Sequence, residues 1–207
     1  MSRKSNTSLS HGCDGTAKQY RRRIGNGNRH PACADFRGVA DLARYCAGAC
    51  AIWPGSGAIF RRPVAPADIH LTLVPPWNEV SPAEAVEKLR RVVDRFCPFT
   101  LTFRHVGYGP EPKRPRFLWA ECVASKEIAE FRVALIQAFG QADERPFRPH
   151  VTLARLRDKG RALARKHPLD QDLALTQRIE SIELMQSPPP DGSGYKILAS
   201  VPLAVSL

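Results

Sequence analysis

Two short segments of the chain repeat one pattern of residues that could transfer protons: His70-Leu71-Thr72-Leu73 and His150-Val151-Thr152-Leu153. Because side chains alternate between the two faces of a β-strand, the histidine and threonine of each segment share one face, and the two apolar residues take the other. The apolar pair can enter a core, which leaves an imidazole and a hydroxyl side by side, twice. Imidazoles titrate near neutral pH, so this doubled arrangement suits phosphodiester chemistry.

A phosphate held between the two segments would have an imidazole on each side. One neutral histidine can take a proton from an attacking water, and the other, protonated, can give a proton to the departing ribose oxygen. Thr72 and Thr152 would hydrogen-bond the non-bridging phosphate oxygens, which gain charge in the transition state. Arg148 and Arg155 are candidate phosphate contacts. Arg148 shares strand parity with His150, whereas Arg155 does not and would need the strand to twist or end there.

Each of these features has a purely structural alternative. A histidine beside a β-forming threonine can be a buried, hydrogen-bonded core residue, and an arginine is usually a solvated surface charge. The repetition of the whole pattern favours the functional interpretation. The six cysteines include no C-x-x-C pair, and no carboxylate cluster lies near either segment, so the sequence predicts chemistry without a metal or another cofactor.

Composition narrows the class of partner and the compartment. The chain has 207 residues, with 31 Lys and Arg against 20 Asp and Glu and a net charge of +11. This balance favours polyanionic partners, nucleic acid first among them, although a generally basic surface would give the same total. The N-terminus lacks a signal-peptide pattern, and no stretch approaches the ~20 apolar residues of a membrane span. We therefore expect a cytoplasmic monomer without a membrane partner.

Strands and helices alternate along the chain, and each type has its usual boundary signals. Ser81-Pro82 and Ser125 are helix starts, with stops at Pro98 and Gly140. The strands are predicted over residues 69–74, 99–104, 116–123, 148–156, 179–186 and 194–202, with a loop over 107–115 and a short helix after Asp158. The order indicates an α+β fold with antiparallel sheets. Similar elements follow each histidine segment, which indicates two pseudo-symmetric lobes with helices outside and a central cleft.

The two segments, with Pro149 before the second and Ala154-Arg155 after it, resemble the paired signatures of the two-histidine phosphoesterases. Within that superfamily the chain is similar to the bacterial RNA 2',3'-cyclic phosphodiesterases, also called the 2'-5' RNA ligase family. The resemblance extends over roughly residues 58–205. It is also carried by Val64 to Ile69, Arg114 to Trp119, Leu184 to Ser187 and Gly194-Tyr195.

The resemblance implies a bilobal α+β fold that opens a terminal 2',3'-cyclic phosphate of RNA to a 2'-phosphomonoester without a metal. It also implies a reverse ligation that forms 2'-5' linkages. His70 would be the proton donor to the 3'-oxygen and His150 the proton acceptor from water, although the residues alone do not distinguish these roles. Two other functions stay open: a phosphodiesterase for a small cyclic nucleotide or ADP-ribose cyclic phosphate, and a catalytically silent RNA-binding module.

Residues 1–57 depart from the family pattern. Family members usually open with an apolar strand and a helix that complete the first lobe, whereas this segment is rich in Arg, Gly and Asn. We expect residues 58–207 to form the phosphoesterase domain. The preceding segment would be divergent, disordered or incomplete, or would reflect a misassigned start or reading frame.

Overall fold

The computed structural model describes residues 29–30, 32–34, 60–111, 113–157, 160–188 and 194–204. The prediction for residues 1–57 therefore falls almost entirely outside the described residues. The strands are β1 (Arg29–His30), β2 (Ala32–Ala34), β3 (Phe60–Pro63), β4 (Leu71–Thr72), β5 (Trp77–Asn78), β6 (Phe99–Gly109), β7 (Phe117–Cys122), β8 (His150–Leu156), β9 (Asp170–Ile179), β10 (Ser181–Gln186) and β11 (Lys196–Pro202). The helices are the 3-10 turn η1 (Pro66–Asp68), α3 (Pro82–Val93), α4 (Lys126–Ala138) and α5 (Gly160–Lys166).

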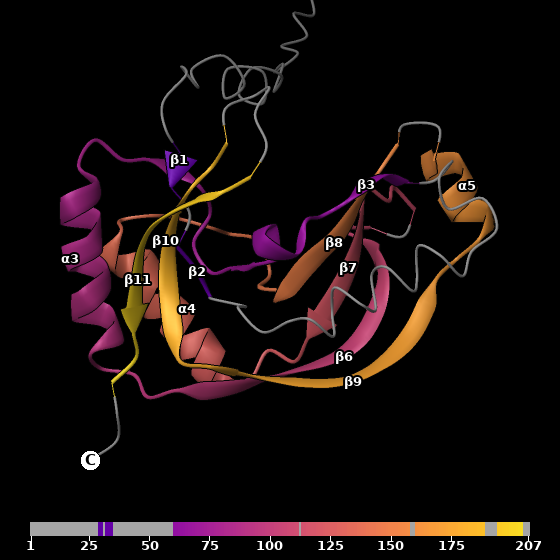
Figure 1. Ribbon diagram of the computed structural model, residues 1–207. Coiled ribbons are helices and arrows are strands. Elements are labelled where there is room, and N and C mark those ends of the chain that lie inside the picture. The colour runs from indigo at the N-terminus through magenta and orange to yellow at the C-terminus, as the bar shows by residue number, and fades with distance from the viewer. Residues whose placement is uncertain are drawn as a thin grey trace, which may run out of the picture.

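One large antiparallel sheet organises the molecule (Figure 1). Its strand order is β11-β10-β2-β4-β8-β7-β6-β9, and β3 pairs with β8 beside this path. β1 and β5 form a separate antiparallel pair. Mixed helices and antiparallel strands of this kind confirm the predicted α+β class.

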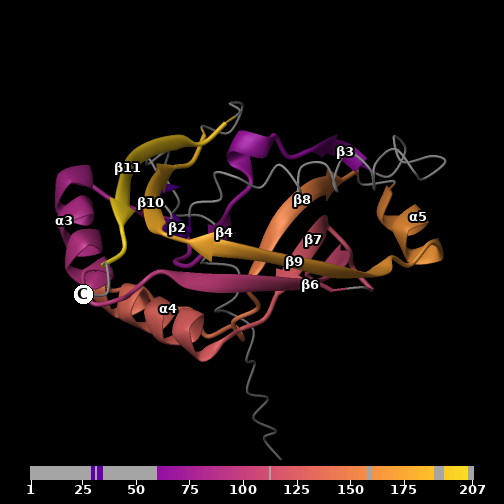
Figure 2. The ribbon, with the colours of Figure 1, turned by 60° about the horizontal axis from the view of Figure 1, so that its bottom comes forward.

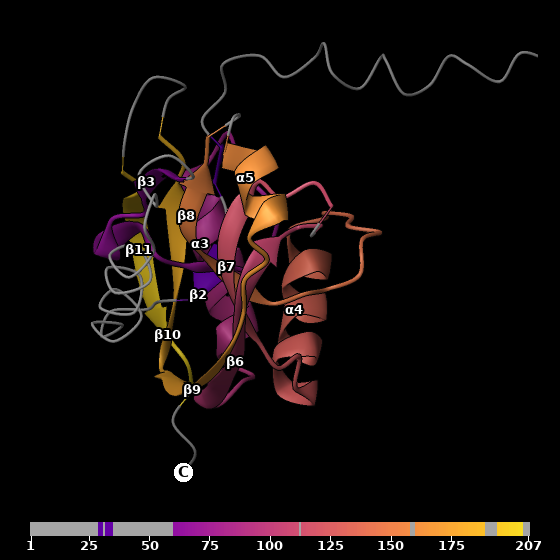
Figure 3. The same cartoon turned by 90° about the vertical axis from the view of Figure 1, so that its right-hand side faces the viewer.

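The sheet divides between β4 and β8 into two halves of similar construction. The first half contains β11, β10, β2 and β4 with helix α3, and the second contains β8, β7, β6 and β9 with helix α4. Figure 2 shows α3 beside β11 and α4 beneath β6 and β9, and Figure 3 shows α4 on one side of the sheet. The two motif strands, β4 and β8, are thus direct neighbours in the middle of one sheet, and each is the innermost strand of its half.

Both long helices form where their start signals predict. Helix α3 begins at Pro82, after Ser81, whose Oγ accepts a hydrogen bond from the Glu84 backbone N–H at 3.3 Å. Helix α4 follows Ser125 and is stopped at Gly140, whose φ of 59° lies in the left-handed region that glycine tolerates. The apolar faces of both helices pack into one core, in which the Phe131 ring of α4 lies 5.9 Å from Phe99 of β6.

Three strand predictions need correction. The strand expected over 69–74 is reduced to Leu71–Thr72, because the chain turns away before Pro75, which has no N–H for a ladder. The strand expected over 99–104 continues to Gly109 and takes three residues from the predicted loop, since β7 and β9 pair with it on both sides. The third correction is an omission, because the sequence predicted neither β9 nor the short strands β1, β2, β3 and β5. The remaining predicted strands appear as β7, β8, β10 and β11, and the helix after Asp158 as α5.

Candidate active site

The two histidine segments meet at a single pair of strand residues. Leu71 of β4 is the register partner of Val151 of β8, and both side chains are fully buried in the core. In an antiparallel pair, the residue before a matched position on one strand lies opposite the residue after it on the other strand. Each motif histidine therefore lies opposite the threonine of the other motif. One face of this strand pair packs into the core. We call the opposite face, which carries His70, Thr72, His150 and Thr152, the site face.

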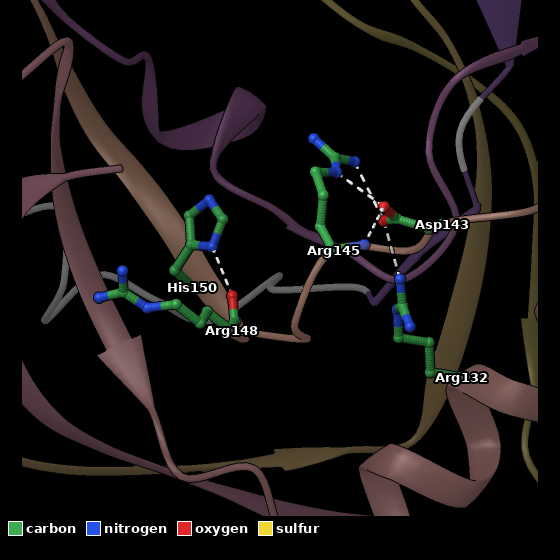
Figure 4. A network of polar contacts seen from close by, with 5 residues as sticks. All are labelled: Arg132, Asp143, Arg145, Arg148 and His150. Carbon is green, nitrogen blue, oxygen red and sulfur yellow. Dashed lines mark hydrogen bonds and ion pairs between the residues drawn. The ribbon is translucent and has the colours of Figure 1, made fainter. Parts of the chain in front are cut away.

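Both imidazoles are held in the same way by the backbone two residues earlier. His70 Nδ1 bonds to the carbonyl of Asp68 at 2.8 Å, and His150 Nδ1 bonds to the carbonyl of Arg148 at 2.7 Å (Figure 4). A carbonyl oxygen can only accept, so Nδ1 carries a proton in both charge states of each ring. The proton that each ring gains or loses is therefore the one on Nε2.

The two rings differ in their aromatic neighbours. The imidazole of His150 is stacked on the indole of Trp119 with 3.6 Å between centroids and 23° between planes. The imidazole of His70 meets the ring of Tyr195 edge-on, at 4.5 Å and 67°. Burial is the main influence on each histidine, and it lowers the pKa of both. Neutral imidazole is therefore more accessible here than in free histidine.

Each histidine has a nearby acid that raises its pKa and a nearby base that lowers it. After burial and the backbone bond, the Asp68 carboxylate raises the pKa of His70, while the charges of Arg155 and His150 lower it. For His150, Glu121 raises the pKa and Arg148 lowers it. The residue whose carbonyl holds the ring is thus an acid beside His70 and a base beside His150.

A β-bulge brings Arg155 to the site face. Between its pairings with Leu118 and Trp119 of β7, strand β8 contains one extra residue, Leu153. Leu153 and the residue after it are both buried, and the alternation is reversed beyond them. Arg155 is exposed, its guanidinium lies 5.8 Å from the centroid of Phe117, and its charge reaches His70. Without the bulge, Arg155 would lie on the opposite face of the strand from His150. The bulge reverses the alternation and lets the two side chains share the site face.

Arg148 is engaged with the protein itself. Its guanidinium donates to the Glu121 carboxylate of β7 and, at 3.1 Å, to the carbonyl of Pro110. It also lies 5.8 Å from the centroid of Trp119. These contacts tie the start of β8 to β7 and to the loop before it. The side chain remains about half exposed, so it is accessible at the edge of the site face.

An ion-pair network fixes the segment that leads into β8 (Figure 4). The Asp143 carboxylate accepts hydrogen bonds from Arg132 of α4 at 2.8 Å and from Arg145 at 2.7 Å. Arg132 also lies 4.6 Å from the centroid of Phe147. Sequence reasoning missed this network, because a lone aspartate in a polar loop gives no signal of its partners. It also missed Asp68, although its place two residues before the motif histidine matches that of Arg148.

Within the described part of the chain, no three His, Cys, Asp or Glu side chains are grouped so that they could hold a metal ion. A search of the same residues finds no helix that is long and apolar enough to cross a membrane.

The family profile and the similar curated proteins indicate the same family. A profile described as the 2'-5' RNA ligase superfamily matches residues 57–188. Two curated proteins named RNA 2',3'-cyclic phosphodiesterase are similar: that of Bacillus subtilis (strain 168), 29% identical over 102 residues, and that of Aquifex aeolicus (strain VF5), 27% identical over 108 residues. These matches cover 46% and 47% of this chain and 56% of each relative, so the chain spans about half the length of these relatives.

Solved structures share the fold. The protein TT0787 of Thermus thermophilus matches with a TM-score of 0.64 and 21% identity, over 86% of this chain and all of that one. E. coli LigT in complex with 3'-AMP matches with a TM-score of 0.59 and 24% identity, over 85% of this chain and 98% of that one. At these identities the likeness establishes the architecture.

Proposed function

Since the chain belongs to the 2'-5' RNA ligase superfamily, we propose that it hydrolyses a terminal 2',3'-cyclic phosphate of RNA to a 2'-phosphomonoester. The observation that carries the proposal is the pairing of β4 with β8 at Leu71 and Val151, beside which two imidazoles share one face. With each Nδ1 committed to a carbonyl, both rings have Nε2 for proton transfer. The names of the similar curated proteins support the same reaction.

The reaction needs one proton acceptor and one proton donor. His150 Nε2 takes a proton from water as the water oxygen attacks phosphorus. The bond from phosphorus to the 3'-oxygen breaks, and His70 Nε2 gives its proton to that oxygen. Thr72 and Thr152 donate hydrogen bonds to the non-bridging oxygens, and Arg155 adds positive charge. The products are a 2'-phosphate and a 3'-hydroxyl, and proton exchange with solvent restores both histidines.

The assignment of roles to the two rings follows what the resemblance implies. Of the two residues whose carbonyls hold the rings, Asp68 favours protonated His70 and Arg148 favours neutral His150, while Arg155 opposes the first effect and Glu121 the second. The steps use side-chain groups alone, and we propose that they need no metal. A 5'-hydroxyl of a second RNA in place of water would undergo the same transfers and form a 2'-5' linkage. RNA is then the partner, and we propose a cytoplasmic monomer.

The test is hydrolysis of a short 5'-labelled RNA ending in a 2',3'-cyclic phosphate, with EDTA present. We expect wild type to form a 2'-phosphate, identified by phosphorus NMR, and His70→Ala and His150→Ala each to lose about 10²- to 10⁴-fold in rate. His167→Ala, which changes an exposed histidine after α5, is the matched control. A folded wild type without turnover, or turnover that survives both motif substitutions, would contradict the proposal. Faster turnover of 2',3'-cyclic AMP than of RNA would indicate a small cyclic nucleotide as substrate.

A further inference from the structure

Trp119 occupies an unusual place in the fold. It is 6% exposed, yet it lies on the site face and outside the main core cluster. Among the described residues its indole Nε1 has no hydrogen-bond partner. Burying an unpaired N–H costs about 1–3 kcal/mol, which Leu or Phe would avoid. The need to fill space does not explain a tryptophan at this position. Its contact with His150 is a second possible reason.

The indole ring is enclosed between a glycine and the imidazole. A Cβ placed on Gly109 of β6 would lie 2.2, 2.3 and 2.6 Å from three adjacent ring carbons of Trp119, namely Cε3, Cδ2 and Cζ3. Three such similar distances mean that Gly109 faces the plane of the ring and not its edge. His150 stacks at 3.6 Å, so it must occupy the opposite face. The order through the site face is β6 backbone, indole, imidazole.

We infer that Gly109 and Trp119 are positioning residues for His150, an inference that rests on the proposed function for its catalytic meaning. Gly109 lets the indole lie against the β6 backbone, and the indole then sets the height and tilt of the imidazole. Besides the covalent bond to Cβ, the carbonyl of Arg148 holds the ring only at Nδ1, so the ring can still tilt about the line that joins these two anchors. The stacked indole removes this freedom and directs Nε2 toward the substrate.

The indole has two further neighbours. The ring of Phe117 lies parallel to it, 6.2 Å away with 9° between planes, and the Arg148 guanidinium lies 5.8 Å from its centroid. A methyl group at position 109 would press on one face of the indole and so push the ring toward His150 on the other face. Bringing a 2.2 Å approach to ordinary van der Waals distance moves the ring by about 1–2 Å. A displacement of that size at a reacting group can cost about 10²-fold in rate.

Neighbouring Gly107 provides a matched control on the same strand. Gly107 is the register partner of Trp119, but a Cβ there would meet mainly the Cε1 end of the His105 side chain, at 2.5 Å. That imidazole is partly exposed and can move, although the movement would break its 2.7 Å contact with Asp170. Gly107→Ala thus adds the same atom to the same strand and leaves the support of His150 in place.

The test compares four variants with wild type in hydrolysis of the cyclic-phosphate RNA. We expect Gly109→Ala and Trp119→Leu to lower kcat about 10²-fold with KM nearly unchanged, because a misplaced base weakens the transition state more than substrate binding. Trp119→Phe keeps an aromatic face and should recover most of kcat, within about tenfold of wild type. Gly107→Ala should stay within about twofold. An equal loss of kcat in Gly107→Ala and Gly109→Ala would overturn the inference, since it would indicate general damage to β6.

A second measurement does not depend on activity. NMR of the His150 ring protons should show an upfield shift from the indole in wild type, which Trp119→Leu abolishes and Trp119→Phe partly retains. The ring pKa should rise in Trp119→Leu as water reaches the uncovered face. A Trp119→Leu protein with wild-type ring shifts and kcat would overturn the inference, even if Gly109→Ala failed to fold. If the wild type is inactive but shows the shifted ring signals, the proposed function is rejected, whereas the support of His150 by Trp119 stands.

Discussion

The two halves of the sheet present the same pair of side chains but support them differently. In each half, a carbonyl two residues before the motif histidine accepts from Nδ1. In the second half His150 then rests on the face of an indole, whereas in the first half His70 and the Tyr195 ring make a T-shaped contact. The supporting residue is acidic beside His70 and basic beside His150. Under the proposed function, this difference in support is what would distinguish a proton donor from a proton acceptor on a near-symmetric scaffold.

The halves also differ in how the motif strands are anchored. The Asp68 carboxylate accepts from the backbone N–H of Tyr195 at 2.9 Å, which ties the 3-10 turn before β4 to the connection before β11. In the second half, Asp143 joins the segment before β8 to helix α4 through Arg132. A long-range hydrogen bond from a backbone N–H to a carboxylate thus positions β4, and an ion-pair network positions β8.

The largest effect on stability should come from breaking that network. Asp143→Ala leaves Arg132, whose side chain is 13% exposed, without its carboxylate, so we expect a loss of about 1.5–3 kcal/mol in the free energy of unfolding. Urea denaturation measures this loss. Glu144→Ala, at the exposed neighbouring position, is the control and should change little. An Asp143→Ala protein as stable as the control would show that the loop is positioned by backbone contacts alone.

The same network has a defined pH dependence. Hydrogen bonds from Arg145 lower the pKa of Asp143, with burial opposing them and the charges of Arg145 and Arg132 assisting. A depressed pKa in the folded state means that the contribution is complete above the unfolded pKa of about 3.9 and is lost as pH falls through the folded value. Stability of the wild type should therefore fall further than that of Asp143→Asn as pH is lowered through this range.

The same contrast between halves explains which features the sequence could predict. The histidine segments, both helix starts and the antiparallel α+β class follow from local pattern and capping residues. Arg155 was ambiguous, because a one-residue bulge at Leu153 reverses strand parity without any marker in the sequence. Among the described strands, β9 pairs with β6 alone, at the edge of the sheet, so most of its side chains are exposed and its hydrophobic signal is weak. Its alternating Leu173, Leu175 and Ile179 was the usable clue.

A smaller difference between halves concerns the helix starts. Ser81 Oγ caps α3, whereas the Ser125 side chain makes no capping bond to α4 and interacts instead with the Glu127 carboxylate. Ser81→Ala should therefore reduce the free energy of unfolding by about 1 kcal/mol, and Ser125→Ala by less. Urea denaturation of the two variants, run beside wild type, measures the difference. Equal losses would mean that the hydroxyl of Ser125 caps α4 in solution.

The finest comparison isolates the charges beside the two histidines. Asp68→Asn keeps an oxygen for the Tyr195 N–H and the carbonyl for His70, so it removes charge alone and lowers the pKa of His70. Arg148→Gln leaves Glu121 without its cation, and the pKa of His150 rises. If His70 donates and His150 accepts, each change reduces the fraction of enzyme with protonated His70 and neutral His150.

The measurement is kcat/KM as a function of pH for both variants. We expect values below wild type wherever the affected ring titrates, by about tenfold, since one charge near a half-buried ring is worth about 1–2 kcal/mol. This sign does not depend on which histidine has the higher pKa, because apparent values from a coupled pair cannot be assigned individually. Reversed roles would require neutral His70 with protonated His150, and both substitutions would then increase that population. A rise in kcat/KM in both variants would therefore exchange the donor and the acceptor while leaving the two-histidine chemistry in place.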